Sequence, residues 1–428
     1  MKRFANKNRK LLLFLRYPII IVSIFLMIGI IFIFLLNAYF YVTKPKQTIE
    51  ITQGAPPVAP VIPYFPQLFG MESFFPNFYF IYFIIAFSIV ALFHELAHGL
   101  YMVLYKVKIK STGFLFLGPI LGAFVEQDDE KFRKKSNIEQ MTILGAGVFI
   151  NFLLFIFFMF ILYIFFISFY QPAGYAIIDY PKTLINVSQI ENYTSISNNL
   201  TLIKTKDGSN FVLPNKVFYS LKNNLTGYEK IIVYYYAPLI VNDVKGYITS
   251  IDGKEVKNSD DVYYILKEKK PGDNIFIKTE FKGEERKYSL KLEENPRNSS
   301  LGFMGIELIS RKQIVDLNKN RNFLSKILSK IFSLKDPLVL YKPTINKEVA
   351  EYIYYLIWWC MIINFFVALF NMLPFGIFDG GRFNYLLILS LTKSDDRTKK
   401  IYNFISSIVI LSFLLILLSW FFSRIIFR

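Results

Sequence analysis

The sequence has very little histidine and cysteine, and its charge is strongly unbalanced. Among 428 residues there are two histidines and one cysteine, while 49 lysines and arginines face 32 acidic residues, a net charge of +17. A single cysteine, Cys360, excludes an intrachain disulfide, and its position inside an apolar run favours a buried structural thiol. Any site built from histidine must therefore use the same two side chains.

Long apolar runs are abundant, since 54% of the residues are hydrophobic and 46 are Phe. A helix needs about 20 apolar residues to cross a hydrocarbon core of about 30 Å. The five uncharged runs are residues 18–41, 78–93, 141–170, 352–378 and 401–422. The second reaches membrane length only if it continues through His94, Glu95 and His98 to residue 105. The first is longer than a signal-peptide core and predicts a retained anchor.

The basic residues gather in two short segments, so the charge does not predict a nucleic-acid partner. Residues 2–16 carry six of them and residues 106–135 carry seven, whereas the loop between the first two runs holds only Lys44 and Lys46. This alternation is the positive-inside pattern, and it predicts a multi-pass protein of the cell membrane, surrounded by lipid, with a cytoplasmic N-terminus.

The composition along the chain predicts four parts. Residues 1–75 hold an anchor and a proline-rich extracytoplasmic loop, and 76–170 hold two spans and a connecting loop whose glycines interrupt an apolar stretch. Residues 171–349 are polar, with alternating strand-like runs, and predict an extracytoplasmic β-rich domain. Residues 350–428 hold the last spans. The expected fold is a polytopic α-helical membrane protein with about five transmembrane helices, a re-entrant β-loop and an inserted β-rich domain.

Both histidines lie in the sequence HELAH, as His94 and His98, with Glu95 between them. Positions four apart share one helix face, so both imidazoles can bind one zinc ion beside a carboxylate that acts as general base. The motif also arises by chance in helices. Here, however, it lies in an apolar run, where a glutamate costs roughly 2.5–3.5 kcal/mol and is a functional candidate by default.

Asp379 is the candidate third ligand, in the segment NMLPFGIFDGGR of residues 371–382. Pro374 and Gly376 break a helix there, and the two glycines after Asp379 allow close backbone approach. An ordinary turn with Asp379 capping the next helix is the alternative. The second and fourth spans run in the same direction, which puts Asp379 and the histidines towards the same, cytoplasmic, end.

Four stretches resemble the site-2 protease family of intramembrane zinc metalloproteases. They are FHELAHG at 93–99, NMLPFGIFDGG at 371–381, GPILGAFVE at 118–126 and GAGVFINF at 145–152. The resemblance implies one Zn²⁺ held by His94, His98 and Asp379, with Glu95 as base. It further implies that Asn371, Gly118, Gly122 and Asn151 contact substrate, and that single-span membrane proteins are cleaved in regulated intramembrane proteolysis. For Asn151, a polar residue in an apolar helix, a hydrogen bond to a neighbouring span is the alternative.

The segment from Gly246 is similar to the latter part of a PDZ domain, with a strand, an Asp252–Gly253 turn, a helix and a strand pair. Residues 300–308 are the candidate carboxylate-binding loop, so the resemblance implies binding of substrate C-termini. Two other functions stay open. A zinc transporter would need several ligands along a path, and the chain has no third histidine; a PDZ scaffold with a structural metal site would have no need of Glu95.

Overall fold

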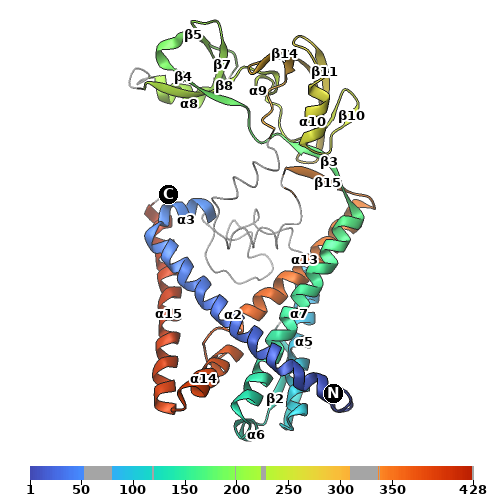
Figure 1. Ribbon diagram of the computed structural model, residues 1–428, viewed down its shortest axis with the longest axis vertical. Coiled ribbons are helices and arrows are strands. Elements are labelled where there is room, and N and C mark those ends of the chain that lie inside the picture. Colours follow the sequence, from blue (N-terminus) through green and yellow to red (C-terminus); the bar gives the residue numbers. More distant parts are fainter. Residues whose placement is uncertain are drawn as a thin grey trace. The chain divides into compact units, whose positions relative to one another are not determined.

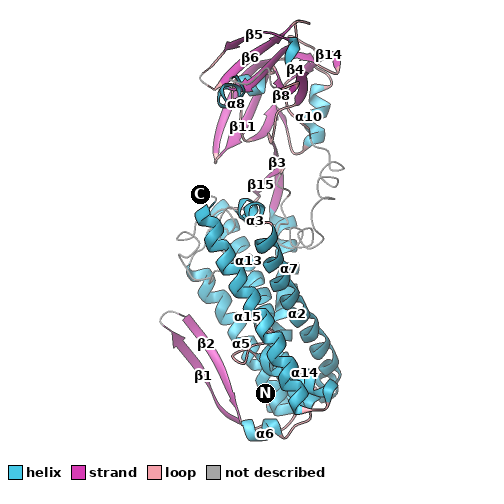
Figure 2. Cartoon of the chain, turned by 90° about the vertical axis from the view of Figure 1, so that its left-hand side faces the viewer, coloured by secondary structure: helices cyan, strands magenta, loops and turns pink. Residues whose placement is uncertain are grey.

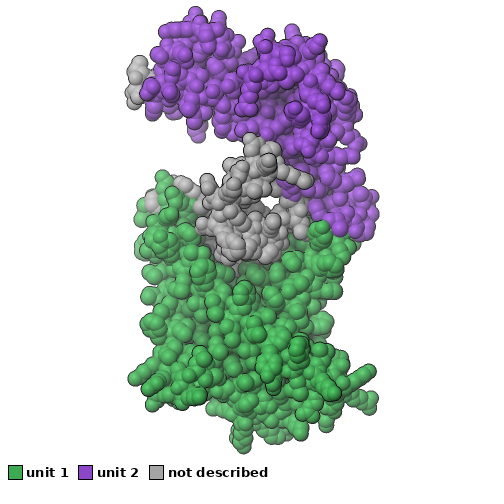
Figure 3. Space-filling view, viewed as in Figure 1, with its two compact units in different colours: residues 1–165, 348–428 green, residues 166–347 purple. Residues whose placement is uncertain are grey.

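The computed structural model describes residues 1–52, 80–117, 120–197, 199–222, 228–308, 336 and 338–426. The chain forms two compact units, one of residues 1–165 with 348–428 and the other of residues 166–347 (Figures 1 and 3). The proline-rich loop around Pro56 and the candidate substrate residue Gly118 lie outside the described residues. The expected division into four parts stays a prediction.

The first unit is mainly helical (Figure 1). Its elements are α1 (Lys2–Lys7), α2 (Arg9–Thr43), α3 (Pro45–Thr52), α5 (Phe80–Leu104), β1 (Ile109–Leu117), β2 (Ile120–Gln127), α6 (Asp129–Arg133), α7 (Asn137–Phe169), α13 (Lys347–Phe370), α14 (Asp379–Thr392) and α15 (Asp395–Ile426). Five of the described helices, α2, α5, α7, α13 and α15, are long and apolar enough to cross a membrane. The expectation of a multi-pass membrane protein agrees with them.

These helices expose large apolar side chains as well as burying them. Phe25 on α2 is 69% exposed and Phe160 on α7 is 61% exposed, whereas Trp359 on α13 is fully buried. A helix that is apolar on all sides is stable where lipid covers its outer face. More of the apolar window of α13 is buried than of any other candidate span, so α13 is the most enclosed of the five.

The fourth apolar run extends to residue 378, and α13 ends within it at Phe370, in line with the helix break predicted at Pro374 and Gly376. Pro374 lacks an N–H and cannot continue a helix, and residues 371–378 instead form consecutive turns. Asp379 then begins a separate helix, α14. The helix that the alternative expected after the turn is present, but its N-cap is Phe378 and Asp379 is its first residue, so Asp379 does not cap it.

The loop between α5 and α7 contains an antiparallel hairpin, β1 with β2, that runs alongside the helices (Figure 2). Leu115 pairs with Gly122 and Thr112 with Val125. Strand β2 packs closely along α5. The expected strand-like loop is therefore present as two paired strands directly beside the helix that carries HELAH.

The second unit is β-rich and contains two larger sheets. Its elements are β3 (Tyr170–Ala176), β4 (Lys182–Asn186), a 3-10 turn (Val187–Gln189), β5 (Ile190–Ser195), β6 (Leu200–Thr205), β7 (Asn210–Pro214), α8 (Asn215–Lys222), β8 (Lys230–Tyr235), α9 (Pro238–Val241), β9 (Tyr247–Ile251), β10 (Lys254–Glu255), α10 (Ser259–Leu266), β11 (Asn274–Phe281), β12 (Glu284–Lys291), β13 (Glu293–Asn295), β14 (Asn298–Phe303) and β15 (Val339–Pro343). One sheet has the order β12-β11-β9-β3-β15, with β10 on β9, and the other β4-β8-β7-β6-β5.

The elements expected from Gly246 onward are present in the expected order. Strand β9 leads through a turn at Asp252 and Gly253, both with positive φ, to β10, α10 and the β11–β12 pair. The side chain of Asn258 caps α10 in a reciprocal capping box with Asp261, an arrangement that satisfies two otherwise unpaired backbone donors. That this arrangement is a PDZ domain stays a prediction.

Candidate metal centre

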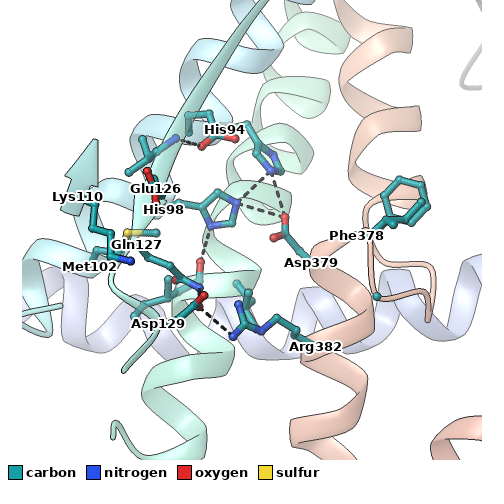
Figure 4. A pocket seen from close by; sticks show the side chains of 16 residues that line it. His94, His98, Met102, Lys110, Glu126, Gln127, Asp129, Phe378, Asp379 and Arg382 are labelled. Atoms are coloured by element: carbon teal, nitrogen blue, oxygen red, sulfur yellow. Dashed lines mark hydrogen bonds and ion pairs between the residues drawn. The ribbon is translucent and has the colours of Figure 1, made fainter. Parts of the chain in front are cut away.

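Two histidines of α5 and an aspartate far from them in the sequence meet in the helical unit (Figure 4). His94 Nε2 and His98 Nε2 each lie 3.2 Å from Asp379 Oδ2, and the two Nε2 atoms are 3.0 Å apart. Both histidines are buried, at 8% and 7% exposure. Among the described residues these three form a group whose ligand atoms lie close enough together for one ion.

The mutual distances suit a tetrahedral zinc site. Zinc binds imidazole nitrogen at 2.0–2.1 Å, so two ligand atoms of a regular tetrahedral site are about 3.3–3.4 Å apart. The observed 3.0–3.2 Å is within a few tenths of that edge. Three protein ligands also leave the fourth position open, as catalytic zinc sites do.

The tautomer of His98 is set by the backbone of α7. His98 Nδ1 lies 2.7 Å from the carbonyl oxygen of Ile143, so Nδ1 carries the proton and donates it to that oxygen. Nε2 of His98 then carries no proton, and its lone pair is directed towards Asp379 and His94. Hydrogen bonding of the distal ring nitrogen is the usual way to orient a metal-binding imidazole.

Asn151, also on α7, contacts the other imidazole. Its Nδ2 lies 2.9 Å from His94 Nδ1, its side chain is fully buried, and its Oδ1 has no partner among the described residues. Turning the amide by half a turn, which exchanges two groups of nearly equal shape, lets Oδ1 accept the Nδ1 proton of His94. That orientation leaves His94 Nε2 free for a metal and pairs the amide oxygen, while Nδ2 takes the position that has no partner among the described residues.

Gly147 lies between these two contact points on the same face of α7, four residues from Ile143 and four from Asn151. A Cβ at Gly147 would overlap His98 Nε2 and lie 2.7 Å from His94 Nε2. The absence of a side chain at this position is therefore what allows α7 to support both imidazoles.

Asp379 is brought to the histidines by the turn that ends at α14. The N–H of Gly380 donates to the carbonyl oxygen of Asn371 at 2.7 Å. A Cβ on Gly380 would overlap the backbone of Met372, and one on Gly381 the backbone of Phe375. Asp379 also occupies the first turn of α14, where the helix dipole favours a carboxylate.

Glu95 lines the same pocket as the three candidate ligands. The pocket has a volume of about 400 Å³ and is bordered by α5, β2, the start of α14 and the turn before it. Glu95 Oε2 accepts a hydrogen bond from the backbone N–H of Val125 at 2.9 Å. The candidate base and the candidate ligands therefore face one shared space.

An ion pair lies at the rim of this pocket. Arg382 Nη2 is 3.1 Å from Asp129 Oδ1 (Figure 4). The Arg382 guanidinium also lies over the ring of Phe132, 4.9 Å from its centroid. Burial acts to raise the pKa of Asp129, but the hydrogen bond and charge of Arg382 outweigh it and hold this pKa below its usual value. The pair links α14 to α6, directly after β2.

The candidate substrate residues that the structure describes lie outside the pocket lining. Neither Asn371 nor Gly122 nor Asn151 is among the residues that line the pocket. Gly122 belongs to β2, and Asn151 lies behind His94 rather than in the pocket, so the structure suits it to orient a ligand and not to touch substrate. The roles of Ile143, Gly147, Val125 and Arg382 were not foreseen. The spacing of Gly147 and Asn151 by four was the one sequence signal for this face of α7.

Replacing Asn151 with Leu is expected to weaken zinc binding by about 10–100-fold, the usual cost of losing a partner behind a metal-binding imidazole. Leucine keeps most of the volume but cannot accept the His94 proton. Zinc affinity, measured by competition with a chelator in detergent, tests this. Asn364→Leu is the matched control, because Asn364 is equally buried but bonds to the carbonyl of Cys360. Wild-type zinc affinity in Asn151→Leu would contradict the assignment.

A known protein family matches most of the chain. The model of peptidase family M50 matches residues 82–415, which include all three candidate ligands and Glu95. A segment of 73 residues is 42% identical to an uncharacterized protein of Methanocaldococcus jannaschii. That segment is 17% of this chain and spans only 20% of the relative's length. With a family match over most of its length, apolar helices of membrane length and a site for one metal ion, the chain belongs to peptidase family M50, whose members are zinc-dependent membrane metallopeptidases.

Proposed function

We propose that the protein is an intramembrane zinc endopeptidase that hydrolyses peptide bonds in or near the transmembrane segments of single-span membrane proteins. The observation that carries the proposal is the joining of His94, His98 and Asp379 within a pocket that Glu95 also lines. His94 lies ten residues, or about 15 Å, before the end of α5, so the site is well inside a helix of membrane length.

The donor set fits zinc by its chemistry as well as its distances. Two imidazole nitrogens and one carboxylate oxygen are common ligands of catalytic zinc. When bound, the ion lowers the pKa of a water molecule and polarises the scissile carbonyl. Ile143 and Asn151 orient the imidazoles, and Asp379 contributes the negative charge that a divalent cation requires.

Glu95 is the proposed general base. It accepts a proton from the attacking water and then gives it to the amide nitrogen that leaves. One water is consumed, the C–N bond breaks, and a carboxylic acid and an amine form. Glu95 has this role among the carboxylates that line the pocket, because Asp129 is paired with Arg382 and Glu126 accepts a hydrogen bond from Ser111.

The proposed substrate is a membrane helix that unwinds locally to present a carbonyl. Strand β2, to which Gly122 belongs, could pair along its outer edge with the unwound segment by strand addition. Gly118 is proposed as a further substrate contact. Asn371 is proposed to hold substrate from the turn before Asp379. Regulated intramembrane proteolysis is the proposed biological role.

The proposed topology places the N-terminus and the metal site towards the cytoplasm and the β-rich unit outside. The support is the concentration of lysine and arginine at residues 2–16 and 106–135. The β-rich unit, with its PDZ-like order of strands, is proposed to bind the C-termini of substrates. No nucleic-acid partner is proposed.

Cleavage of a single-span protein by the purified chain tests the function. The zinc-loaded protein in detergent is expected to cut a model substrate within its apolar segment, as mapped by mass spectrometry. A chelator should stop cleavage, and added zinc should restore it. Zinc flux in liposomes without any cleavage would favour a transporter, and peptide binding without either activity would favour a PDZ scaffold with a structural metal site.

A further inference from the structure

The proposed base is held by a backbone donor. Glu95 Oε2 lies 2.9 Å from the N atom of Val125, and both residues line the pocket of the metal centre. A hydrogen bond from a backbone N–H to an ionised carboxylate is roughly twice as strong as one between neutral groups. In this state of the molecule, one lone pair of the proposed base is therefore committed to β2.

Val125 presents that N–H on the outer edge of the hairpin. Strand β2 pairs with β1 and, within the described chain, with no other strand. In an antiparallel pair, opposed residues alternate between exchanging hydrogen bonds and directing their backbone groups outward. Because the Val125 N–H reaches Glu95, the pair of Thr112 with Val125 is an outward one. The backbones of Ala123 and Leu121 continue the same edge.

Two acceptors therefore compete for the Val125 N–H. A peptide strand added along this edge would bring its carbonyl oxygens to the outward N–H groups of β2. One N–H cannot serve both that carbonyl and Glu95 at full strength, so pairing and the Glu95 contact exclude each other at Val125.

We propose that the contact between Glu95 and the Val125 N–H is a resting latch, and that strand pairing of substrate with β2 releases Glu95 for catalysis. This inference rests on the proposed proteolytic function and adds its regulation. A peptide too short to pair with β2 leaves Glu95 bound to the Val125 N–H and is cut poorly. A segment that pairs with β2 releases Glu95 and so activates its own cleavage. The device restricts the site to chains that present an extended segment.

An amide-to-ester substitution at position 125 tests the latch in the full-length, zinc-loaded protein. The α-hydroxy analogue of valine, introduced during translation, removes the N–H and keeps the side chain. With a capped tripeptide too short to pair, we expect kcat/KM to rise about tenfold, as expected for the loss of one charge-assisted hydrogen bond. With a single-span substrate, kcat/KM should stay level or fall, because one pairing hydrogen bond is lost.

The same ester at position 124 is the matched control, since the alternation directs the N–H of Phe124 towards β1. It should leave the ratio of kcat/KM between the two substrates unchanged. If the ester at 125 lowers kcat/KM for both substrates, the Val125 N–H positions the base in its active form and the latch is wrong. If it changes neither, the contact does not control Glu95, and the inference is equally overturned.

Hydrogen exchange at the Val125 amide separates the latch from the proteolytic function, because it needs no turnover. In the zinc-loaded wild type this amide should exchange slowly with or without an uncleavable strand-forming peptide. In Glu95→Ala it should exchange fast alone and slowly with the peptide. Fast exchange in Glu95→Ala with saturating peptide would refute strand pairing at Val125. The expected pattern in a protein that cuts no substrate would keep the latch and reject the proposed function.

Discussion

Glu95→Gln is expected to retain zinc and to lose peptide hydrolysis by a factor of about 10²–10⁴, the usual contribution of a general base. Glutamine has the same shape and can still accept the Val125 N–H, so the geometry around the base is kept. It cannot accept a proton from water at neutral pH. Zinc content by metal analysis and cleavage of a single-span substrate are measured on the same preparation.

Glu348→Gln provides the control for this substitution. Glu348 is an exposed residue in the first turn of α13 and does not line the pocket. Its variant should bind zinc and cleave substrate as the wild type does. Full cleavage by Glu95→Gln would remove Glu95 from the mechanism and favour a different base, whereas loss of zinc in that variant would show a structural role for the carboxylate.

Gly147→Ala is expected to abolish zinc binding almost completely while the helices remain folded. The added methyl group would occupy the space of His98 Nε2 and lie 2.7 Å from His94 Nε2, so both imidazoles must turn away. Displacing a ligand costs more zinc affinity than losing a residue that supports a ligand. We therefore expect zinc affinity to fall by at least about 100-fold. Overpacking should lower the free energy of unfolding by about 1–3 kcal/mol. Zinc titration and thermal unfolding of the metal-free protein measure the two effects separately.

Two other glycine substitutions in the membrane helices serve as controls. Gly29→Ala on α2 would meet no atom within 4 Å and should change neither zinc affinity nor stability. Gly145→Ala on α7 would press on Ser23 and Ile19 of α2, so it should lower stability while zinc still binds. Normal zinc affinity in Gly147→Ala would show that α7 and α5 are further apart than the structure has them.

The sequence determined the elements whose signal is local. Apolar runs of membrane length predicted the candidate spans, because the bilayer sets a length that composition alone can match. The HELAH motif predicted two imidazoles on one helix face, because a spacing of four has the same consequence in any α-helix. The end of the fourth helix was indicated by Pro374 and Gly376, which predicted a break within an apolar run that continues to residue 378, and the helix stops at Phe370.

Only the tertiary structure decided how these elements meet. Asp379 is 285 residues from His94 in the chain, and its distance of 3.2 Å follows from the close packing that Gly380 and Gly381 allow. The face of α7 that supports both imidazoles and the hydrogen bond between Val125 and Glu95 likewise depend on the register between separate elements. Residue spacing shows which side chains share a face of one helix or strand. Which other element packs against that face is decided by the packing of the whole unit.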